Sequence, residues 1–494
     1  MNEVWNAPEN GYSISRLALW AWILSFGCTL GGAFVRIALR FQGGRQGVWP
    51  LSVLAAAAAI AFLLHLRRDR RAALALSIGV GVYELLNQGL YLYSFYFADE
   101  DPESLQGMFR LLTSGHWWVY RCLWLPLKFL GGKIEVFGDS VMEIKFEEIK
   151  TNVAEYELVS KMRASFLVMG ALLSRIGSAK VHMPGGCTIG ARPIDLHLKG
   201  FEALGAVVTQ KDNYVEAVVP EDGLHGASIY LDFPSVGATE NIMMAAAMAK
   251  GVTYIENAAE EPEIVDLANF MNKMGARIKG AGTDTIKIEG VEHCRSCSHN
   301  VIPDRIEAGT FMLACAITRG RILIKNVLPD HVKPIMAKLR ECGVTVEMCD
   351  EGMIVIADGE KPLASTDIKT LPYPGFPTDI QSPFMAFLTT VDGASSVIET
   401  VFENRFMHVA ELNRMGANIK TEGNKALIEG GKKLEGAQVI ATDLRAGAAL
   451  VLAGLVAEGT TEISEIYHIE RGYEKFIKKF KNLGANILRL DDNS

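Results

Sequence analysis

Lysine is missing from the first quarter of the chain, and tryptophan is missing from the remainder. The first lysine is Lys128, and the last of the seven tryptophans is Trp124. Up to residue 126 there are ten arginines against eight acidic residues, whereas the whole chain of 494 residues has a formal net charge of −8. We therefore predict two unlike pieces joined near residue 126, and a net acidic chain that has no nucleic-acid partner.

Cysteine is too sparse and too scattered for a disulfide framework. Eight cysteines are spread over the chain, which favours reduced thiols. Cys294-x-x-Cys297, flanked by His293 and His299, has the spacing of half a zinc site, but the chain has no second Cys-x-x-Cys. A polar loop before Pro303 is the better interpretation of this stretch, and we expect no metal site.

Long hydrophobic runs are confined to the lysine-free piece. Residues 17–39, 48–66 and 72–98 are each long enough to cross a hydrocarbon core of about 30 Å. The first 15 residues have no basic region typical of a cleavable signal peptide. We predict three transmembrane helices, with residues 116–130 as a fourth candidate that either crosses the membrane or lies at its interface. A buried hydrophobic bundle remains the alternative.

Arginines set the predicted orientation of this membrane piece. Four of them lie between the second and third runs, and acidic residues follow the third run. The excess of positive charge in cytoplasmic loops places the arginine loop in the cytoplasm. The chain is then expected at the cell membrane, attached through residues 1–126, with its remaining part facing the cytoplasm.

An internal repeat dominates the chain after residue 126. A helix-like segment that ends in glycine and is followed by a strand-like segment recurs at intervals of 68 to 74 residues. The glycines at these six positions are Gly131, Gly205, Gly275, Gly343, Gly416 and Gly484. A second glycine precedes five of them by 23 to 28 residues, at Gly177, Gly251, Gly320, Gly393 and Gly459. All eleven are predicted to end helices in the left-handed conformation.

Each repeat of about 70 residues is predicted to run strand, helix, strand, helix, strand, which indicates an α/β fold. Examples are a strand over 285–290, a helix over 308–317 and a strand over 322–325. Gly131 has no partner glycine about two dozen residues before it. The first unit is therefore predicted to be truncated.

Polar stretches gather at the edges of these units, and several contain arginine. Alone, each is best explained as a helix cap or a surface ion pair. Together, arginines at equivalent edges of a repeat suit the recognition of phosphate or carboxylate. The glycine-rich stretch from Pro184 to Asp195 holds Cys187 and Arg192, so it is either a tight turn with a buried thiol or a reactive site.

Residues from about 127 to the end resemble the UDP-N-acetylglucosamine enolpyruvyl transferase family. The matching stretches are KMRAS at Lys161, PGGCTIGARPID at Pro184, SVGATEN at Ser235, EPEIVD at Glu261, PDRIEAGTF at Pro303, FPTDIQ at Phe376, ETVFENRFMH at Glu399, ATDLRA at Ala441 and HIERGYE at His468. The resemblance implies a two-domain enolpyruvyl-transferase fold of repeated α/β units, with domains at 127–302 and 303–494. It also implies an active site between the domains.

The implied reaction transfers enolpyruvate from phosphoenolpyruvate to the 3-hydroxyl of UDP-N-acetylglucosamine, the first committed step of peptidoglycan synthesis. By resemblance, Cys187 donates a proton to the enol carbon and Asp379 takes one from the sugar hydroxyl. Arg192 and Arg471 would hold the phosphate, with Arg445 assisting. The remaining implied substrate-binding residues are Arg163, Pro193, Ile194, Asp195, Leu196, Ser235, Val236, Gly237, Val401, Arg405 and Asp443. No cofactor and no metal are implied.

One part of the family pattern has no counterpart here. The family begins with a strand and a loop whose lysine contacts phosphoenolpyruvate, and no Lys-Asn pair occurs before residue 127. Two alternatives to the active transferase therefore stay open. One is an inactive fusion of a membrane protein with a truncated transferase. The other, the related shikimate-pathway transferase, is disfavoured by the Cys187 loop.

Overall fold

The computed structural model describes residues 5–6, 13–14, 130–137, 141–154, 156–159, 166–183, 194–359 and 362–490. The chain divides into two units, Met1–Ser114 and Gly115–Ser494. In the first unit only the backbone of β1 (Trp5–Asn6) and β2 (Ser13–Ile14), an antiparallel pair, is described. The predicted transmembrane segments 17–39, 48–66 and 72–98 lie outside the described residues. Within the described ranges, no helix has the length and apolar character that a membrane crossing needs.

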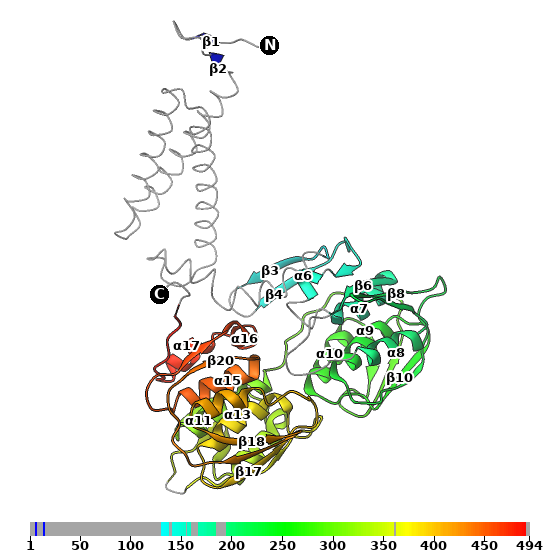
Figure 1. The fold of residues 1–494 in the computed structure, drawn as a ribbon. Helices are drawn as coiled ribbons and strands as arrows, with labels where there is room; N and C mark the ends of the chain where they lie inside the picture. The colour runs from blue at the N-terminus through cyan, green and yellow to red at the C-terminus, as the bar shows by residue number, and fades with distance from the viewer. Residues whose placement is uncertain are drawn as a thin grey trace. The chain divides into compact units, whose positions relative to one another are not determined.

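Three four-stranded sheets repeat one arrangement (Figure 1). Their strand orders are β5-β6-β8-β7, β9-β10-β12-β11 and β16-β17-β19-β18 when each is read from its first strand. In every case the first two strands are parallel, the last two form an antiparallel hairpin, and the fourth strand in sequence pairs with the second. The strand bounds are Val153–Ala154, Ser178–His182, Val207–Gln210 and Tyr214–Val218 for β5 to β8; Ser228–Tyr230, Val252–Glu256, Arg277–Lys279 and Thr285–Glu289 for β9 to β12; and Ile368–Lys369, Ala394–Ile398, Asn418–Glu422 and Lys425–Glu429 for β16 to β19.

Three further sheets contain only part of this arrangement. Strands β13 (Arg321–Ile324), β14 (Thr345–Cys349) and β15 (Gly352–Ile356) form an antiparallel sheet in the order β13-β15-β14. Strands β20 (Gln438–Ile440) and β21 (Glu462–Ser464) form a parallel pair, and β3 (Lys133–Phe137) and β4 (Val141–Lys145) form a hairpin.

The predicted order of elements within a unit was wrong by one strand. Each complete unit runs strand, helix, strand, helix, strand, strand, because the segment predicted as one final strand is a hairpin. The turn between β18 and β19 is short, with Gly423 at φ +57°. A turn of two or three residues hardly interrupts the alternation of apolar residues, so the sequence pattern does not separate the two strands.

Two hydrophobic cores form within the second unit. We call them the first core, which runs from Leu130 to Ile288, and the second core, which runs from Ile306 to Phe480. The first core contains α7 (Val168–Ile176), α8 (Asp195–Ala203), α9 (Val236–Ala246) and α10 (Pro262–Lys273), and a short α6 (Tyr156–Val159) precedes them. The predicted boundaries at 126/127 and 302/303 stay predictions.

The second core holds the helices α11 (Arg305–Ile317), α12 (Lys333–Glu341), α13 (Thr378–Thr389), α14 (His408–Arg414), α15 (Leu444–Gly454), α16 (Tyr467–Glu470), α17 (Phe476–Asn482) and the short 3₁₀ helix η2 (Pro329–Val332). Helix α13 is buried from Ile380 to Thr389, as expected of a helix that is apolar all round. It packs against α11 and α15, so the first turns of these central helices carry most of their polar residues.

Ten of the eleven predicted glycine caps have positive φ, from +74° at Gly177 to +113° at Gly393. Six of the ten end a described helix as predicted, namely Gly177, Gly205, Gly275, Gly343, Gly416 and Gly484, whereas Gly251, Gly393 and Gly459 lie four or five residues beyond a helix end. Gly320 was predicted wrongly, because the left-handed residue there is Arg319 with φ +54°. The N–H of Gly320 still bonds the Cys315 carbonyl at 3.0 Å. The helix therefore ends one residue earlier than the repeat suggests, and Arg319 bears the strain of the left-handed conformation.

Candidate active site

Asp379 lies at the start of a buried helix and between two arginines. It occupies the first turn of α13, after Pro377, where the helix dipole favours a carboxylate. Its Oδ1 accepts a hydrogen bond from Arg405 Nη2 at 2.8 Å, and its Oδ2 accepts one from Arg445 Nη2 at 3.2 Å. The Asp379 side chain remains 41% exposed, so it is both held by the protein and open to solvent.

The two arginines are held from different helices. Arg405 precedes α14, is 2% exposed, and also bonds the Thr378 carbonyl at 3.4 Å. Arg445 lies in the first turn of α15, and Asp443 caps that helix by accepting its backbone N–H at 2.8 Å. Arg405 Nη1 approaches Asp443 Oδ1 to 3.9 Å. The predicted residues Asp379, Arg405, Asp443 and Arg445 therefore form one group, here called the Asp379 cluster.

The charges of the Asp379 cluster keep its carboxylate ionised. Burial alone would raise the pKa of Asp379, but the positive charges of Arg445 and Arg405 outweigh it and hold that pKa well below its usual range. Burial likewise tends to lower the pKa of Arg445, and Asp379 more than offsets this. A carboxylate with so low a pKa is a weak base, so Asp379 accepts a proton only from a strongly activated donor.

His408 is a buried base beside the cluster. Its side chain is fully buried, and its Nδ1 lies 3.1 Å from the Arg405 carbonyl oxygen, to which it donates. Burial, with the charge of Arg405 adding to it, lowers the pKa of His408 to about 4. His408 is therefore neutral in the folded protein at neutral pH.

We expect the folded state to lose stability between pH 6.5 and 4 because of His408. The unfolded chain takes up a proton near pH 6.5, whereas the folded protein does so only near pH 4. Above pH 6.5 the neutral His408 costs the folded state nothing. At pH 5 the free energy of unfolding should be lower by about 1–2 kcal/mol than above pH 6.5. Urea unfolding of the wild type and of His408→Asn at pH 7 and pH 5 measures it. An equal pH dependence in both proteins would contradict the assignment.

The Tyr473 ring packs against the Arg445 guanidinium and fixes its position, a role that was not predicted from the sequence. Its ring is 2% exposed, and its hydroxyl lies 2.8 Å from Thr310 Oγ1 of α11. The Arg445 guanidinium lies over this ring, 5.3 Å from its centre. Burial raises the pKa of Tyr473, so its hydroxyl stays protonated. Thr310, Tyr473, Arg445 and Asp379 thus form a continuous chain of contacts.

Removing the Tyr473 hydroxyl should weaken this series of contacts. Tyr473→Phe is expected to lower the free energy of unfolding by about 1 kcal/mol, because Thr310 loses one of its two buried hydrogen-bond partners and keeps only the Ile306 carbonyl. Thr310→Val made in the Tyr473→Phe background should add little. A double-mutant cycle by urea unfolding measures the coupling. Strictly additive losses would show that the two hydroxyls do not interact.

Glu399 organises the loop that carries the predicted sugar-site residue Val401. It is 2% exposed, and its Oε1 accepts hydrogen bonds from Val401 N at 2.7 Å and from Thr370 Oγ1 at 2.9 Å. Its Oε2 accepts a bond from Thr378 Oγ1 at 3.0 Å, directly before Asp379. The backbone at Val401 and the start of α13 are therefore fixed to one carboxylate. The stretch beginning at Glu399 was matched to the family, but no role was assigned to Glu399.

In the first core, two helix N-termini with predicted sugar-site residues meet. Ser235 caps α9 as predicted, with its Oγ accepting Ala238 N at 3.4 Å, and Val236 and Gly237 follow in the first turn. Ile194, Asp195 and Leu196 begin α8. A Cβ placed on Gly237 would lie 3.3 Å from His197 Cε1, so glycine allows these two helix ends to approach closely.

Asn241, buried on α9, connects three helices in this region. Its Oδ1 accepts a hydrogen bond from Gly170 N in the first turn of α7 at 2.7 Å, and its Nδ2 donates to the Phe166 carbonyl at 3.1 Å. The same Nδ2 lies 3.0 Å from His197 Nδ1 on α8. Asn241 thereby supplies the cap that α7 does not obtain from Leu167.

Asn241→Ala is expected to lower the free energy of unfolding by roughly 2–4 kcal/mol, because it leaves buried groups of α7 unpaired. Urea unfolding followed by circular dichroism measures the loss. Asn418→Ala is the matched control, since its amide bonds Glu429 at the surface and should cost under about 1 kcal/mol. Similar losses in the two variants would argue against this capping role.

Several predicted residues are not brought into either group. Arg163, Cys187, Arg192 and Pro193 lie outside the described residues. Arg471 ends α16 on the surface, and within the described ranges no ion pair joins it to the Asp379 cluster. Arg471 stands two residues before Tyr473, whose ring lies under Arg445, and α16 packs against α15.

In the half zinc motif, the two cysteines form no disulfide and His299 is paired with a carboxylate. Cys294 and Cys297 are exposed and free, and His299 Nε2 pairs with Asp266 Oδ1 at 2.9 Å. No group of three His, Cys, Asp or Glu side chains suited to a metal ion occurs in the part of the chain that the structure describes.

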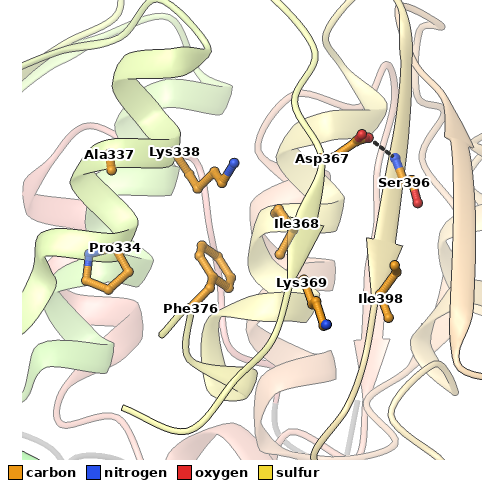
Figure 2. Close-up of a pocket in the computed structure, with 9 residues that line it drawn as sticks. All are labelled: Pro334, Ala337, Lys338, Asp367, Ile368, Lys369, Phe376, Ser396 and Ile398. Carbon is orange, nitrogen blue, oxygen red and sulfur yellow. Dashed lines mark hydrogen bonds between the residues drawn. The ribbon is translucent and has the colours of Figure 1, made fainter. Parts of the chain in front are cut away.

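A groove of about 410 Å³ lies between α12 and the parallel strands β16 and β17, as Figure 2 shows. Its lining residues are Pro334, Ala337, Lys338, Asp367, Ile368, Lys369, Phe376, Ser396 and Ile398. Lys338 is paired with Glu341 at 2.6 Å, and Asp367 accepts the Ser396 N–H at 2.7 Å. None of the predicted site residues lines this groove, and two of its three charged groups, Lys338 and Asp367, already have partners.

The Asp379 cluster combines an ionised carboxylate with two guanidinium groups that are held in place. Arginine guanidinium groups bind phosphate and carboxylate, and a carboxylate can accept a proton from an activated hydroxyl. Such a site suits a reaction between an anionic substrate and a hydroxyl compound.

Sequence comparison gives two kinds of match. The family described as EPSP synthase (3-phosphoshikimate 1-carboxyvinyltransferase) matches residues 125–480. The chain is 65% identical over 342 residues to UDP-N-acetylglucosamine 1-carboxyvinyltransferase 1 of Caldanaerobacter subterraneus subsp. tengcongensis, which covers 69% of this chain and 81% of that protein. It is 60% identical over 367 residues to the UDP-N-acetylglucosamine 1-carboxyvinyltransferase of Finegoldia magna, covering 74% and 86%.

Solved structures support the fold. The enolpyruvyl transferase NikO from Streptomyces tendae superposes with a TM-score of 0.65 at 23% identity, covering 74% of this chain and 86% of that one. EPSP synthase from Acinetobacter baumannii superposes with a TM-score of 0.56 at 18% identity, covering 74% and 87%. The predicted α/β fold of repeated units is thereby confirmed for this part of the chain.

Proposed function

The chain belongs to the UDP-N-acetylglucosamine 1-carboxyvinyltransferase family of enolpyruvyl transferases, and from this we propose its reaction and substrates. It transfers enolpyruvate from phosphoenolpyruvate to the 3-hydroxyl of UDP-N-acetylglucosamine and releases phosphate, as the first committed step of peptidoglycan synthesis. The observation that carries the proposal is the carboxylate of Asp379 held between Arg405 and Arg445 at the start of α13.

In the proposed mechanism, Cys187 donates a proton to the enol carbon of phosphoenolpyruvate. The sugar 3-hydroxyl then attacks the adjacent carbon and gives its proton to Asp379. Loss of phosphate, and return of a proton from the new methyl group to the Cys187 thiolate, restore the double bond. Arg192 and Arg471 hold the phosphate with help from Arg445, whose position is fixed by Asp379 and Tyr473.

The proposed sugar site joins the helix starts of the first core to the Val401 loop of the second. Arg163, Arg192 and Pro193 belong to it by resemblance. The close approach of α8 and α9 supports a role for the remaining residues of the first core, because two helix N-termini present free N–H groups to an anion. Glu399 supports a role for Val401, because it fixes the backbone there.

Residues 1–126 are proposed to attach the transferase part to the inner face of the cell membrane. The support is the length of the three apolar runs and the arginine loop between the second and third. Carbonate extraction of membranes tests the attachment, and protease treatment of intact spheroplasts tests the side. Release of the chain by carbonate would contradict attachment by transmembrane helices.

Phosphate release tests the reaction. The purified full chain in detergent is incubated with UDP-N-acetylglucosamine and phosphoenolpyruvate, and Cys187→Ala serves as the matched control. We expect release that depends on both substrates and is lost in the control. Release no faster than that of Cys187→Ala would favour the inactive fusion. Release that requires shikimate 3-phosphate in place of the nucleotide sugar would favour the related transferase.

A further inference from the structure

Glu399 is a buried carboxylate with no ion-pair partner among the described side chains. It directly follows β17 and is 2% exposed. Burying a charged group away from water is costly unless hydrogen bonds or an opposite charge compensate for it. The hydrogen bonds of Glu399 must therefore account for its presence inside the second core.

Four donors from three segments of the chain converge on this carboxylate. Its Oε1 accepts hydrogen bonds from Val401 N at 2.7 Å, from Phe402 N at 3.2 Å and from Thr370 Oγ1 at 2.9 Å. Its Oε2 accepts one from Thr378 Oγ1 at 3.0 Å. A carboxylate offers about four lone-pair sites, whereas a glutamine has one amide oxygen and a donor group. Only an acidic residue can accept all four bonds, which explains the carboxylate at this buried position.

One route from Glu399 to Asp379 runs through the backbone of α13. Thr378 is the first residue of that helix, and Asp379 is the second. The Thr378 hydroxyl is held by Glu399, and the Thr378 carbonyl accepts a hydrogen bond from Arg405 Nη2 at 3.4 Å. Because Thr378 is held at both its side chain and its carbonyl, the backbone that carries Asp379 has little freedom.

A second route runs through Phe402 and Arg405. The Phe402 N–H is bonded to Glu399 Oε1, and the Arg405 guanidinium lies over the Phe402 ring, 5.6 Å from its centre. Arg405 in turn donates to Asp379 Oδ1 at 2.8 Å. Glu399 thus connects to the backbone of Asp379 and also to its charge partner.

Thr370 holds the loop on the other side of the carboxylate. It is fully buried, and its Oγ1 donates to Glu399 Oε1 and accepts the Thr400 N–H at 2.9 Å. Its carbonyl accepts a hydrogen bond from Thr400 Oγ1 at 2.6 Å. Two threonine hydroxyls therefore bind opposite oxygens of Glu399, Thr370 on the side of the 400–402 loop and Thr378 on the side of α13.

We propose that Glu399 is a positioning residue, which holds the base Asp379 and the sugar-site loop at Val401 in a fixed relation to each other. Asp379 and Val401 have these roles in the proposed function, on which this positioning role depends. Glu399 acts through Thr378 and Arg405 on the base, and through its Oε1 bonds on the loop. The Oε2 bond fixes the orientation of the base, so its loss should lower turnover, and loss of an Oε1 bond should weaken binding of the nucleotide sugar.

Three threonine-to-valine variants, each lacking one hydroxyl, separate these effects. Thr378→Val breaks the Oε2 bond, so kcat for phosphate release should fall about tenfold, with the KM for UDP-N-acetylglucosamine within about twofold of the wild type. Thr370→Val breaks an Oε1 bond, so this KM should rise about tenfold with a smaller change in kcat.

Thr389→Val is the matched control. Thr389 ends the same helix, is 1% exposed, and its hydroxyl bonds the Ala386 carbonyl at 2.7 Å. This variant loses a buried hydroxyl far along α13 from Asp379, so kcat and KM should both stay within about twofold of the wild type. A role of Glu399 in stability alone would lower only the amount of folded enzyme, and would not divide the effects between kcat and KM.

Hydrogen exchange reads the connection without turnover. In the ligand-free full chain in detergent, Thr370→Val should speed exchange at least about threefold both at residues 399–402 and at residues 378–381, because the two segments share Glu399. Thr389→Val should leave exchange at residues 399–402 unchanged.

The two measurements distinguish failure of the positioning role from failure of the proposed function. A wild type that releases no phosphate, with exchange coupled as expected, would refute the proposed function and leave the connection through Glu399 in place. A wild type that releases phosphate would overturn the positioning role if Thr378→Val lost no more kcat than Thr389→Val, or if Thr370→Val left KM unchanged. Faster exchange confined to residues 399–402 would also overturn it. If Thr370→Val fails to fold, the comparison of Thr378→Val with Thr389→Val decides.

Discussion

Asp379→Asn is expected to lower the rate of phosphate release by roughly two to four orders of magnitude. The amide keeps the shape of the side chain but cannot take the proton of the sugar hydroxyl. It also removes the negative charge between Arg405 and Arg445, so Arg445 loses its paired carboxylate and Arg405 keeps only Asp443, at 3.9 Å. The initial rate of phosphate release at saturating substrates measures the effect.

A surface carboxylate is the matched control for this change. Asp330 is 77% exposed and pairs only with Lys333 among the described side chains, so Asp330→Asn should leave the rate within about twofold of the wild type. Binding of UDP-N-acetylglucosamine by calorimetry shows whether Asp379→Asn still folds and binds. A variant that binds the sugar nucleotide and retains full turnover would show that Asp379 is not the base.

The sequence predicted the repeated α/β architecture because glycine at a helix end has few alternatives. The left-handed conformation was confirmed at ten glycines, since a positive φ is costly for other residues, but three of them, Gly251, Gly393 and Gly459, lie four or five residues beyond the helix end. Gly320 failed because Arg319 adopts that conformation one residue earlier. The hairpins were missed for another reason. Their second strands continue the same apolar alternation, and only the hydrogen bonds of the ladder reveal the turn.

Helix caps within the candidate site were predicted from local sequence, whereas the site residues themselves were assigned by resemblance to the family. Ser235 and Asp443 are helix caps, a property readable from a polar residue before an apolar run. Tyr473 and Asn241 were not assigned roles. Tyr473 reaches Thr310, 163 residues away, and Asn241 reaches Gly170, 71 residues away. Such contacts depend on how helices pack, and a single sequence carries no local signal for them.

Arg405→Ala is expected to lower the free energy of unfolding by about 3 kcal/mol, the lower end of the range for breaking a buried ion pair. Arg405 is 2% exposed and touches both Asp379 and Asp443, so its loss leaves two carboxylates with one fewer cation. The lower end applies because Asp379 is 41% exposed, and water can partly replace the lost partner. Urea unfolding of the full chain in detergent measures the change.

Two further variants separate charge from packing in this prediction. Arg405→Met keeps most of the side-chain volume and should still lose more than half of the stability lost by Arg405→Ala, because the unpaired carboxylates remain. Lys433→Ala removes a cation that is 83% exposed from its pair with Glu458, and should cost under about 1 kcal/mol. If Arg405→Ala cost no more than Lys433→Ala, the cluster would not be a determinant of stability. If Arg405→Met were as stable as the wild type, the volume of the side chain rather than its charge would account for the contribution of Arg405 to stability.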